Sequence, residues 1–352
     1  MTSTLTNPED FTKKDYWNKF SSNLGTIQFE WYGEWDEIAT TCDLYVKPKD
    51  KILHVGIGNS DLAARFADHL FAQSQIAIDI ADKAIKFQQK KFNRKGVVYR
   101  IADITSVDES LNNSQVVFDK GTLDAMLPES ESPVDIPERM FDNVINNILA
   151  PFGRYCIVTL GQAQVLDFMV RKLSDFKNIA VKIHVTHVTK INERFKVPVF
   201  MFVIVKMPKD MPFLNITGNS CLNGSGHKIP SYEKIVDFAT AEREFALFQG
   251  EISQRWYIGE EKAIEFTQND KVKYKLIIHD RNFKSRDKAQ DIAAFVVPLG
   301  REAEWVFNDV DGRTSLSKQC NFKRLIFIFA VGKSFQFKSM SHITEELSST
   351  KC

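Results

Sequence analysis

Short apolar runs alternate with longer amphipathic stretches between residues 51 and 206. The run "KILHV" at 51–55 precedes residues 60–72, whose apolar positions recur at the spacing of one helix face. The same order repeats with "QIAIDI" and residues 81–92, and again with "SQVVFDKG", "ERMFDNVINNILA" and "GRYCIVTL". Strands that alternate with helices predict an α/β domain, in which a doubly wound, Rossmann-like sheet carries helices on both faces.

The pattern changes after residue 206. Before it, "AVKIHVTHV" and "VPVFMFVIVKM" predict a final antiparallel pair of strands at an edge of the sheet. Residues 207–231 hold three prolines and three glycines among small polar residues, which is typical of a linker. Residues 232–352 combine a helix-like stretch with shorter strands, and they predict a smaller accessory α+β domain. Residues 1–50 are polar with two aromatic clusters, "DYWNKF" and "FEWYGEW", and form a predicted cap on the domain at 51–206.

Composition excludes several classes of protein. Of 352 residues, 43% are hydrophobic and 26% are charged, which is the balance of a soluble globular protein. A net charge of +1 argues against a broad nucleic-acid footprint, so no direct nucleic-acid binding is expected. The 5 cysteines contain no C-x-x-C pair, which predicts reduced thiols and no metal site. Neither a leader sequence nor an apolar run long enough for a membrane is found, and a cytoplasmic protein is expected.

Two glycines mark the end of the first predicted strand. Gly56 and Gly58 let the backbone turn tightly and let a ligand approach main-chain N–H groups. A dinucleotide site would read G-x-G-x-x-G, but Asp61 holds the third glycine position here. A carboxylate at a helix N-terminus would repel a pyrophosphate. S-adenosylmethionine carries no phosphate, so this departure favours a methyltransferase over a dehydrogenase.

Three carboxylates follow successive predicted strands. Asp79 could accept hydrogen bonds from two ribose hydroxyls, and Asp103 could meet the adenine amino group. Asp119 ends the fourth strand, beside the expected place of the reactive methyl group. The carboxyl ends of parallel strands meet at one edge of a doubly wound sheet, so these acids should converge on one crevice. Each feature alone is as consistent with a turn or a helix cap as with a ligand. The prediction rests on four features together, the glycine turn and the three carboxylates, in their order along the chain.

Several motifs together resemble a known family. They are "DYWNKF", "FEWYGEW", "ILHVGIGNSDLA", "IDI", "IADIT", "FDKGTLDAM" and "PFGRYCIVTL". In these residues the chain resembles the seven-β-strand methyltransferases that modify lysine on translation elongation factor 1-alpha, and in particular the N-terminal half of the lysine and N-terminus methyltransferases of that factor. "FVVPLGREAEWVFNDVDGRTSL" and "FKRLIFIFAVG" resemble the middle segment that joins the two catalytic halves there.

The resemblance implies a seven-stranded sheet, S-adenosylmethionine as cofactor and a set of cofactor contacts. Those contacts are Trp17, Trp31, Gly56, Asp79, Ile80, Asp103, Ile104 and Lys120, with Gly58 and Asp119 added from the strand-end pattern. The two tryptophans would cover the sulfonium cation, since aromatic faces attract cations and exclude water. Lys120 would either pair with the carboxylate of the cofactor or hold the loop after the fourth strand.

The implied activity is methylation of a lysine on elongation factor 1-alpha. The family's second methyltransferase half is not in this sequence, so activity toward the N-terminus of the factor is not expected. Asp119 and Asp124 are the acids nearest the methyl group by motif, but the sequence assigns neither as a base and names no catalytic residue. The accessory domain would recognise the factor, support a homodimer or cover an apolar face of the first domain.

Three other functions compete with this hypothesis. A non-catalytic scaffold would keep the fold without turnover, and the intact glycine turn with Asp79 and Asp103 speaks against it. An NAD-dependent oxidoreductase would need a glycine in place of Asp61. A methyltransferase with a different protein or small-molecule acceptor stays open.

Overall fold

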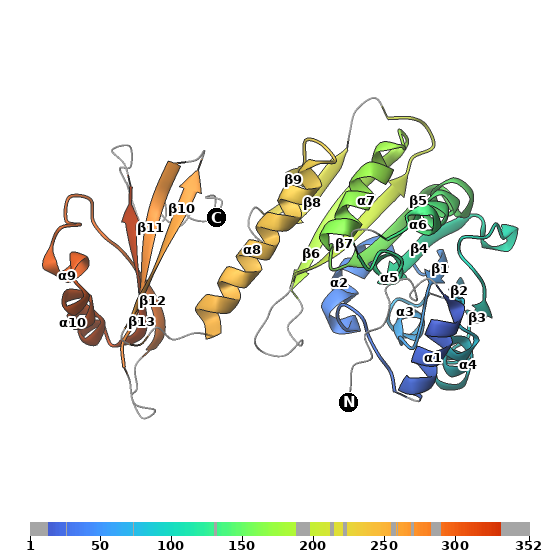
Figure 1. The fold of residues 1–352 in the computed structure, drawn as a ribbon, viewed down its shortest axis with the longest axis horizontal. Coiled ribbons are helices and arrows are strands. Elements are labelled where there is room, and N and C mark those ends of the chain that lie inside the picture. The colour runs from blue at the N-terminus through green and yellow to red at the C-terminus, as the bar shows by residue number, and fades with distance from the viewer. Residues whose placement is uncertain are drawn as a thin grey trace. The chain divides into compact units, whose positions relative to one another are not determined.

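The computed structural model divides the chain into two compact units, residues 1–247 and 248–352. It describes residues 13–331, apart from residues 26, 73, 130–131, 188–197, 212–214, 221–223, 255–257, 259, 269–270 and 283–289. Figure 1 shows the elements of both units.

The larger unit contains nine strands and most of the helices that the structure describes. Its strands are β1 (Lys51–Val55), β2 (Ser74–Asp79), β3 (Val97–Ile101), β4 (Ser114–Lys120), β5 (Leu149–Thr159), β6 (Ile179–His187), β7 (Pro198–Lys206), β8 (Ile216–Ser220) and β9 (Gly224–Lys228). Its helices are α1 (Lys14–Leu24), α2 (Trp35–Tyr45), α3 (Leu62–His69), α4 (Asp82–Lys91), η2 (Glu109–Leu111), α5 (Thr122–Met126), α6 (Asp135–Asp142), η3 (Asn143–Ile148), α7 (Ala163–Ser174) and α8 (Lys234–Gln254), the last of which continues past residue 247.

These strands form one sheet in the order β3-β2-β1-β4-β5-β7-β6-β8-β9 (Figure 1). Strands β1 to β5 pair in parallel, and β7 runs antiparallel between β5 and β6. The chain reverses its direction of winding between β1 and β4, and a ligand crevice is expected outside the carboxyl ends of these strands. The predicted doubly wound α/β sheet is confirmed.

Side chains alternate between two apolar layers. On one face, Leu53 and Val55 of β1 pack with helices α5, α6, α7 and α8. On the other, Ile52 packs with α2, α3 and α4. Because successive residues of a strand point to opposite faces, central strands buried on both faces need continuous apolar runs, as at residues 199–205.

The sheet is wider than the sequence indicates. The predicted antiparallel pair exists as β6 and β7, but the stretch expected to be a linker, 207–231, adds β8 and β9 beyond it. Gly218 of β8 lets α8 pack on this extension, since a Cβ atom there would lie 2.6 Å from the Phe238 ring. The glycine and proline content indicates a segment rich in turns. Its hydrogen bonding to β6 depends on the tertiary structure, so composition does not reveal it.

The smaller unit has the predicted α+β character. A four-stranded sheet runs in the order β10-β11-β13-β12, and its elements are β10 (Glu261–Gln268), β11 (Lys271–Asp280), β12 (Gln290–Val296), α9 (Trp305–Asn308), α10 (Val310–Cys320) and β13 (Phe322–Ala330). Val297, Phe307, Leu325 and Phe327 form its small core. No helix in the described ranges of either unit is long and apolar enough to cross a bilayer.

A buried ion pair fixes the start of β13 to the end of β11. The Arg324 guanidinium donates to both oxygens of Asp280, with Nε and Nη2 each 2.7 Å from the carboxylate. The two side chains are 2% and 0% exposed. A bidentate pair of this kind orients both strands, and neither charge can be removed without leaving the other in a dry environment.

Asp280→Asn is expected to destabilise the smaller unit by about 3 kcal/mol, because it removes the buried carboxylate charge to which the Arg324 guanidinium donates twice. Urea unfolding of the full chain measures this change. The matched control is Glu304→Gln, which breaks a pair with Arg301 on the surface and should leave the unfolding midpoint in place. Equal effects of the two variants would contradict the prediction.

Candidate active site

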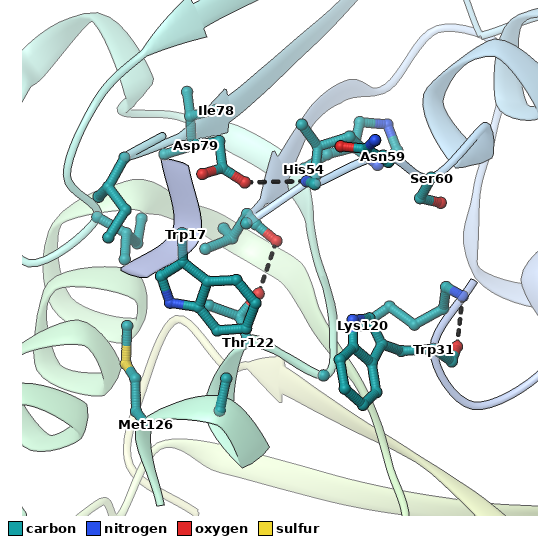
Figure 2. A pocket seen from close by; sticks show the side chains of 18 of the residues that line it. Trp17, Trp31, His54, Asn59, Ser60, Ile78, Asp79, Lys120, Thr122 and Met126 are labelled. Carbon is teal, nitrogen blue, oxygen red and sulfur yellow. Dashed lines mark hydrogen bonds between the residues drawn. The ribbon is translucent and has the colours of Figure 1, made fainter. Parts of the chain in front are cut away.

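A cavity opens at the carboxyl ends of β1 to β4, under residues 17–31. Of the ten residues predicted to contact a cofactor, nine line it: Trp17, Trp31, Gly56, Gly58, Asp79, Ile80, Asp103, Ile104 and Lys120 (Figure 2). Asp119 is not among the residues that line the cavity. The topology thus brings together residues that lie as far apart as 17 and 120 in the sequence.

Two turns meet at the floor of this cavity. Gly56 follows β1 with a φ of +59°, and a Cβ atom added to it would lie 2.2 Å from Oγ1 of Thr122. That hydroxyl donates to the Val55 carbonyl at 2.9 Å. Gly58 has a φ of +52°, and the nearest atom to its added Cβ is 4.0 Å away. Gly56 is therefore required by close contact and by backbone conformation, and Gly58 by conformation alone.

Asp79 ends β2 and holds the glycine turn in place. Its Oδ2 accepts from the Gly58 N–H at 2.9 Å, a bond drawn in Figure 2. Its Oδ1 accepts from the Ala81 N–H at 2.8 Å. Burial raises the pKa of this carboxyl group, and the backbone donors oppose that rise. A carboxylate has about four acceptor positions, so these bonds leave acceptor capacity for a ligand hydroxyl group.

Asp103 follows β3 at an exposed position on the cavity rim. Its Oδ1 accepts from the N–H and the hydroxyl of Thr105, at 2.9 and 2.8 Å. Its Oδ2 accepts no hydrogen bond from the described part of the chain, so it is available to a ligand donor. Ile104, beside it, is buried, and with Ile80 it gives the cavity an apolar wall.

An aromatic lid covers the cavity; we define it as α1 together with residues 27–33. Within it, the Phe29 and Trp31 rings meet edge to face at 5.0 Å between centroids, and Phe20 packs on both. Trp17 joins the cluster through an edge contact with Phe20. Phe20 and Phe29 line the cavity as well. Neither was predicted as a site residue, although they lie in the aromatic clusters "DYWNKF" and "FEWYGEW".

Lys120 anchors this lid. Its ammonium donates to the Glu30 carboxylate at 2.7 Å and to the main-chain carbonyls of Trp31 and Gly33. Figure 2 shows the bond to Trp31. An ammonium has three donors, and all three are used. Of the two roles predicted for Lys120, these bonds support the one in which it holds a loop, and they leave no donor for the carboxylate of a cofactor.

Asp119 lies behind the cavity instead of facing it. The carboxylate is fully buried, accepts from the Thr122 N–H at 2.8 Å, and accepts from the Tyr155 hydroxyl at 3.2 Å. It thereby satisfies the first N–H groups of α5. Asp124 is buried too, and the Thr159 hydroxyl donates to it at 2.8 Å. Both acids that the motif placed near the methyl group are thus structural supports of the β4–α5 turn.

The carboxylate at the start of α3 comes from another residue than expected. Asp61, whose charge was expected to repel a pyrophosphate, turns toward Arg65 at 2.7 Å. Glu30 of the lid occupies the helix N-terminus instead, where its Oε1 accepts from the Asp61 N–H at 2.8 Å and its Oε2 accepts from the Ser60 hydroxyl at 2.7 Å. A carboxylate that would repel a phosphate is therefore present at the start of α3, but it belongs to Glu30 of the lid and not to Asp61.

Two buried acceptors on the cavity wall lack protein partners. Nε2 of His54 lies 2.7 Å from Oε1 of Gln75, and the Gln75 amide donates to the Ala72 carbonyl, so His54 carries its proton on Nε2. Burial lowers the pKa of His54 to about 4, and the ring is neutral. Nδ1 of His54 and Oδ1 of Asn59 accept no bond from the described residues. These atoms fit a ligand that brings hydrogen-bond donors, such as an ammonium group. No cluster of metal ligands occurs in the described ranges.

Comparisons with known proteins agree with this geometry. A model of the ubiE/COQ5 methyltransferase family matches residues 15–130, which hold the lid and the cavity-forming turns. The "eEF1A lysine and N-terminal methyltransferase" of Bos taurus is 30% identical over 97% of this chain and 50% of its own length. The protein of the same name from Homo sapiens is 30% identical over 96% of this chain and 50% of its own length. The "EEF1A lysine methyltransferase 4" of Mus musculus is 23% identical over 42% of this chain and 61% of its own.

In its strand order, and in sequence over residues 15–130 and beyond, the chain is similar to the S-adenosylmethionine-dependent methyltransferases. Within that class it is similar to the eEF1A lysine and N-terminal methyltransferases, and it spans about half the length of these curated relatives. A solved S-adenosylmethionine-dependent methyltransferase from Anabaena variabilis covers 57% of this chain and 96% of its own at 14% identity, with a TM-score of 0.41. The assignment of the fold rests on the strand order and not on that alignment.

Gly56→Ala should abolish cofactor binding, while Gly58→Ala should weaken it only moderately. The first substitution forces Thr122 away from Val55, and the second costs about 1 kcal/mol of backbone strain. Calorimetric titration with S-adenosylhomocysteine measures both, and the two variants serve as each other's control. An equal loss in both would show that close contact at Gly56 does not matter.

Asp119→Asn should make stability less dependent on pH. Burial raises the pKa of Asp119 to about 7, and the nearby Asp124 adds to the rise. The unfolded group titrates near ~3.9, so the native state holds an extra proton between these values and its stability falls as pH rises through about 7. Urea unfolding from pH 5 to 8 should therefore give a flatter curve for the variant. Parallel curves for variant and wild type would contradict this.

Proposed function

We propose that the chain methylates a lysine ε-amine of the elongation factor eEF1A in the cytoplasm. The observation that carries the proposal is the similarity to eEF1A lysine and N-terminal methyltransferases over nearly the whole chain. The proposal names lysine because lysine stands in the names of all of these relatives, including the mouse "EEF1A lysine methyltransferase 4".

The cavity offers a place for each part of the cofactor. We propose that Asp79 binds the ribose with its remaining acceptor capacity and that Oδ2 of Asp103 binds the adenine amino group. Ile80 and Ile104 would contact the adenine ring. Gly56 and Gly58 would let the methionine part approach the main chain, where Nδ1 of His54 and Oδ1 of Asn59 could accept from its ammonium.

S-adenosylmethionine, when bound, supplies a methyl group on a sulfonium cation. The chain itself would position the reacting groups and exclude water from them. Trp17 and Trp31 would lie over the cation, and the aromatic lid would exclude water from it. A lysine amine has a pKa of ~10.4 in water, and an apolar lid lowers that value by disfavouring the ammonium form. Because Asp119 and Asp124 lie behind the β4–α5 turn, the proton would leave through solvent.

The test is incubation of the chain with tritiated S-adenosylmethionine and recombinant eEF1A, followed by mass spectrometry of peptides. Label on a lysine is the expected result. Tight binding of S-adenosylhomocysteine without label on eEF1A would refute the substrate and leave the cofactor site intact. No binding of S-adenosylhomocysteine would favour a scaffold that keeps only the fold.

Asp79→Asn is the matched loss-of-function variant for this test. It keeps one acceptor for the glycine turn but loses charge and acceptor capacity toward the ribose, so S-adenosylhomocysteine should bind at least ~10-fold more weakly. The control, Asp108→Asn, makes the same change on a carboxylate outside the cavity and should bind as wild type does. Unchanged binding by Asp79→Asn would remove the ribose assignment.

A further inference from the structure

Glu30 joins three parts of the molecule that are distant in sequence. From the lid, its carboxylate accepts from the Ser60 hydroxyl, the Asp61 N–H at the start of α3 and the Lys120 ammonium at the end of β4. The side chains of Glu30 and Lys120 are 11% and 6% exposed. Hydrogen bonds in which one or both groups carry charge are the strong ones in proteins, and limited exposure reduces their screening.

The place that Glu30 occupies is one where nucleotide-binding folds put a phosphate. In a doubly wound sheet the first helix after the glycine turn points its free N–H groups and its positive dipole end at the pyrophosphate. Here the Asp61 N–H is taken by Glu30, and the Leu62 N–H is taken by Oγ of Ser60. A carboxylate of the protein itself thus fills the anion site of the fold.

We propose that Glu30 is the residue that selects a phosphate-free nucleoside for this cavity and, through Lys120, keeps the aromatic lid closed over it. The two effects have one cause, because the same carboxylate repels a phosphate and pairs with the ammonium that holds Trp31 and Gly33. Glu30 acts as a positioning residue: it does not line the cavity that its lid covers. The inference rests on the cofactor class and not on eEF1A as substrate.

Binding measurements on the full chain test both effects. Glu30→Gln should weaken binding of S-adenosylhomocysteine about 10-fold, since Lys120 loses its counter-ion and the lid loses the charged part of its anchor. Lys120→Met should weaken it similarly, and the double variant should lose no more than either single one, because both substitutions break the same link. The control is Asp36→Asn, the same change of charge at the start of α2, which should leave binding within twofold of wild type.

Selectivity is tested with ADP and with inorganic pyrophosphate as competitors of S-adenosylhomocysteine. Neither should compete in the wild-type chain. In Glu30→Ala the Ser60 hydroxyl and the Asp61 N–H are released and Lys120 loses its counter-ion, so ADP should compete at least ~10-fold more strongly than in wild type. A Glu30 residue with a merely structural role would produce a loss of binding but no such gain.

The role of Glu30 in anchoring the lid and its role in selectivity can each be contradicted by a separate result. Wild-type affinity for S-adenosylhomocysteine in Glu30→Gln would overturn the lid anchor, and additive losses in the double variant would do the same. No gain of ADP binding in a Glu30→Ala chain with a native circular dichroism spectrum would overturn the selectivity; if that variant does not fold, Glu30→Gln serves for the same competition. Since no step uses eEF1A, failure of the proposed substrate leaves these results unaffected.

Discussion

The contact between two turns determines where this molecule can hold a ligand. The turn after β1 and the turn after β4 touch at Gly56 and Thr122, with no room for a side chain between them, and the Thr122 hydroxyl bonds to the carbonyl just before the glycine. The contact keeps the carboxyl ends of β1 and β4 together at the point where the winding of the sheet reverses. The packing of the sheet therefore forms the cavity, and the contact between the two turns sets the positions of the residues around it.

Buried polar groups support this arrangement from behind. Asp119 caps α5 and Asp124 bonds to the end of β5, so the β4–α5 turn is held by carboxylates that a ligand does not reach. Burial raises the pKa of Asp119 to about 7 and that of Asp124 to about 6. Two neighbouring acids in a dry layer disfavour ionisation, and the protein retains them because each satisfies backbone N–H groups that water cannot reach.

The lid is attached to the sheet by hydrogen bonds of charged groups as well as by apolar packing. Its aromatic rings contact one another, but its main chain is attached by Lys120, and its one inward carboxylate is attached to α3. Rings that only pack on each other can shift together, whereas a lysine with three fixed acceptors defines one position. These bonds explain how a short segment at 27–33 is held over the cavity.

The sequence by itself determined the alternation of strands and helices, the glycine turn and the acids at strand ends, because these depend on local periodicity and on backbone geometry that few residues tolerate. It could not decide which way a strand-end side chain turns: Asp79 faces the cavity and Asp119 faces away. Nor could it pair Glu30 with Lys120, which are 90 residues apart, or attach β8 and β9 to the sheet. Those features depend on which groups meet after folding, so only the tertiary structure decided them.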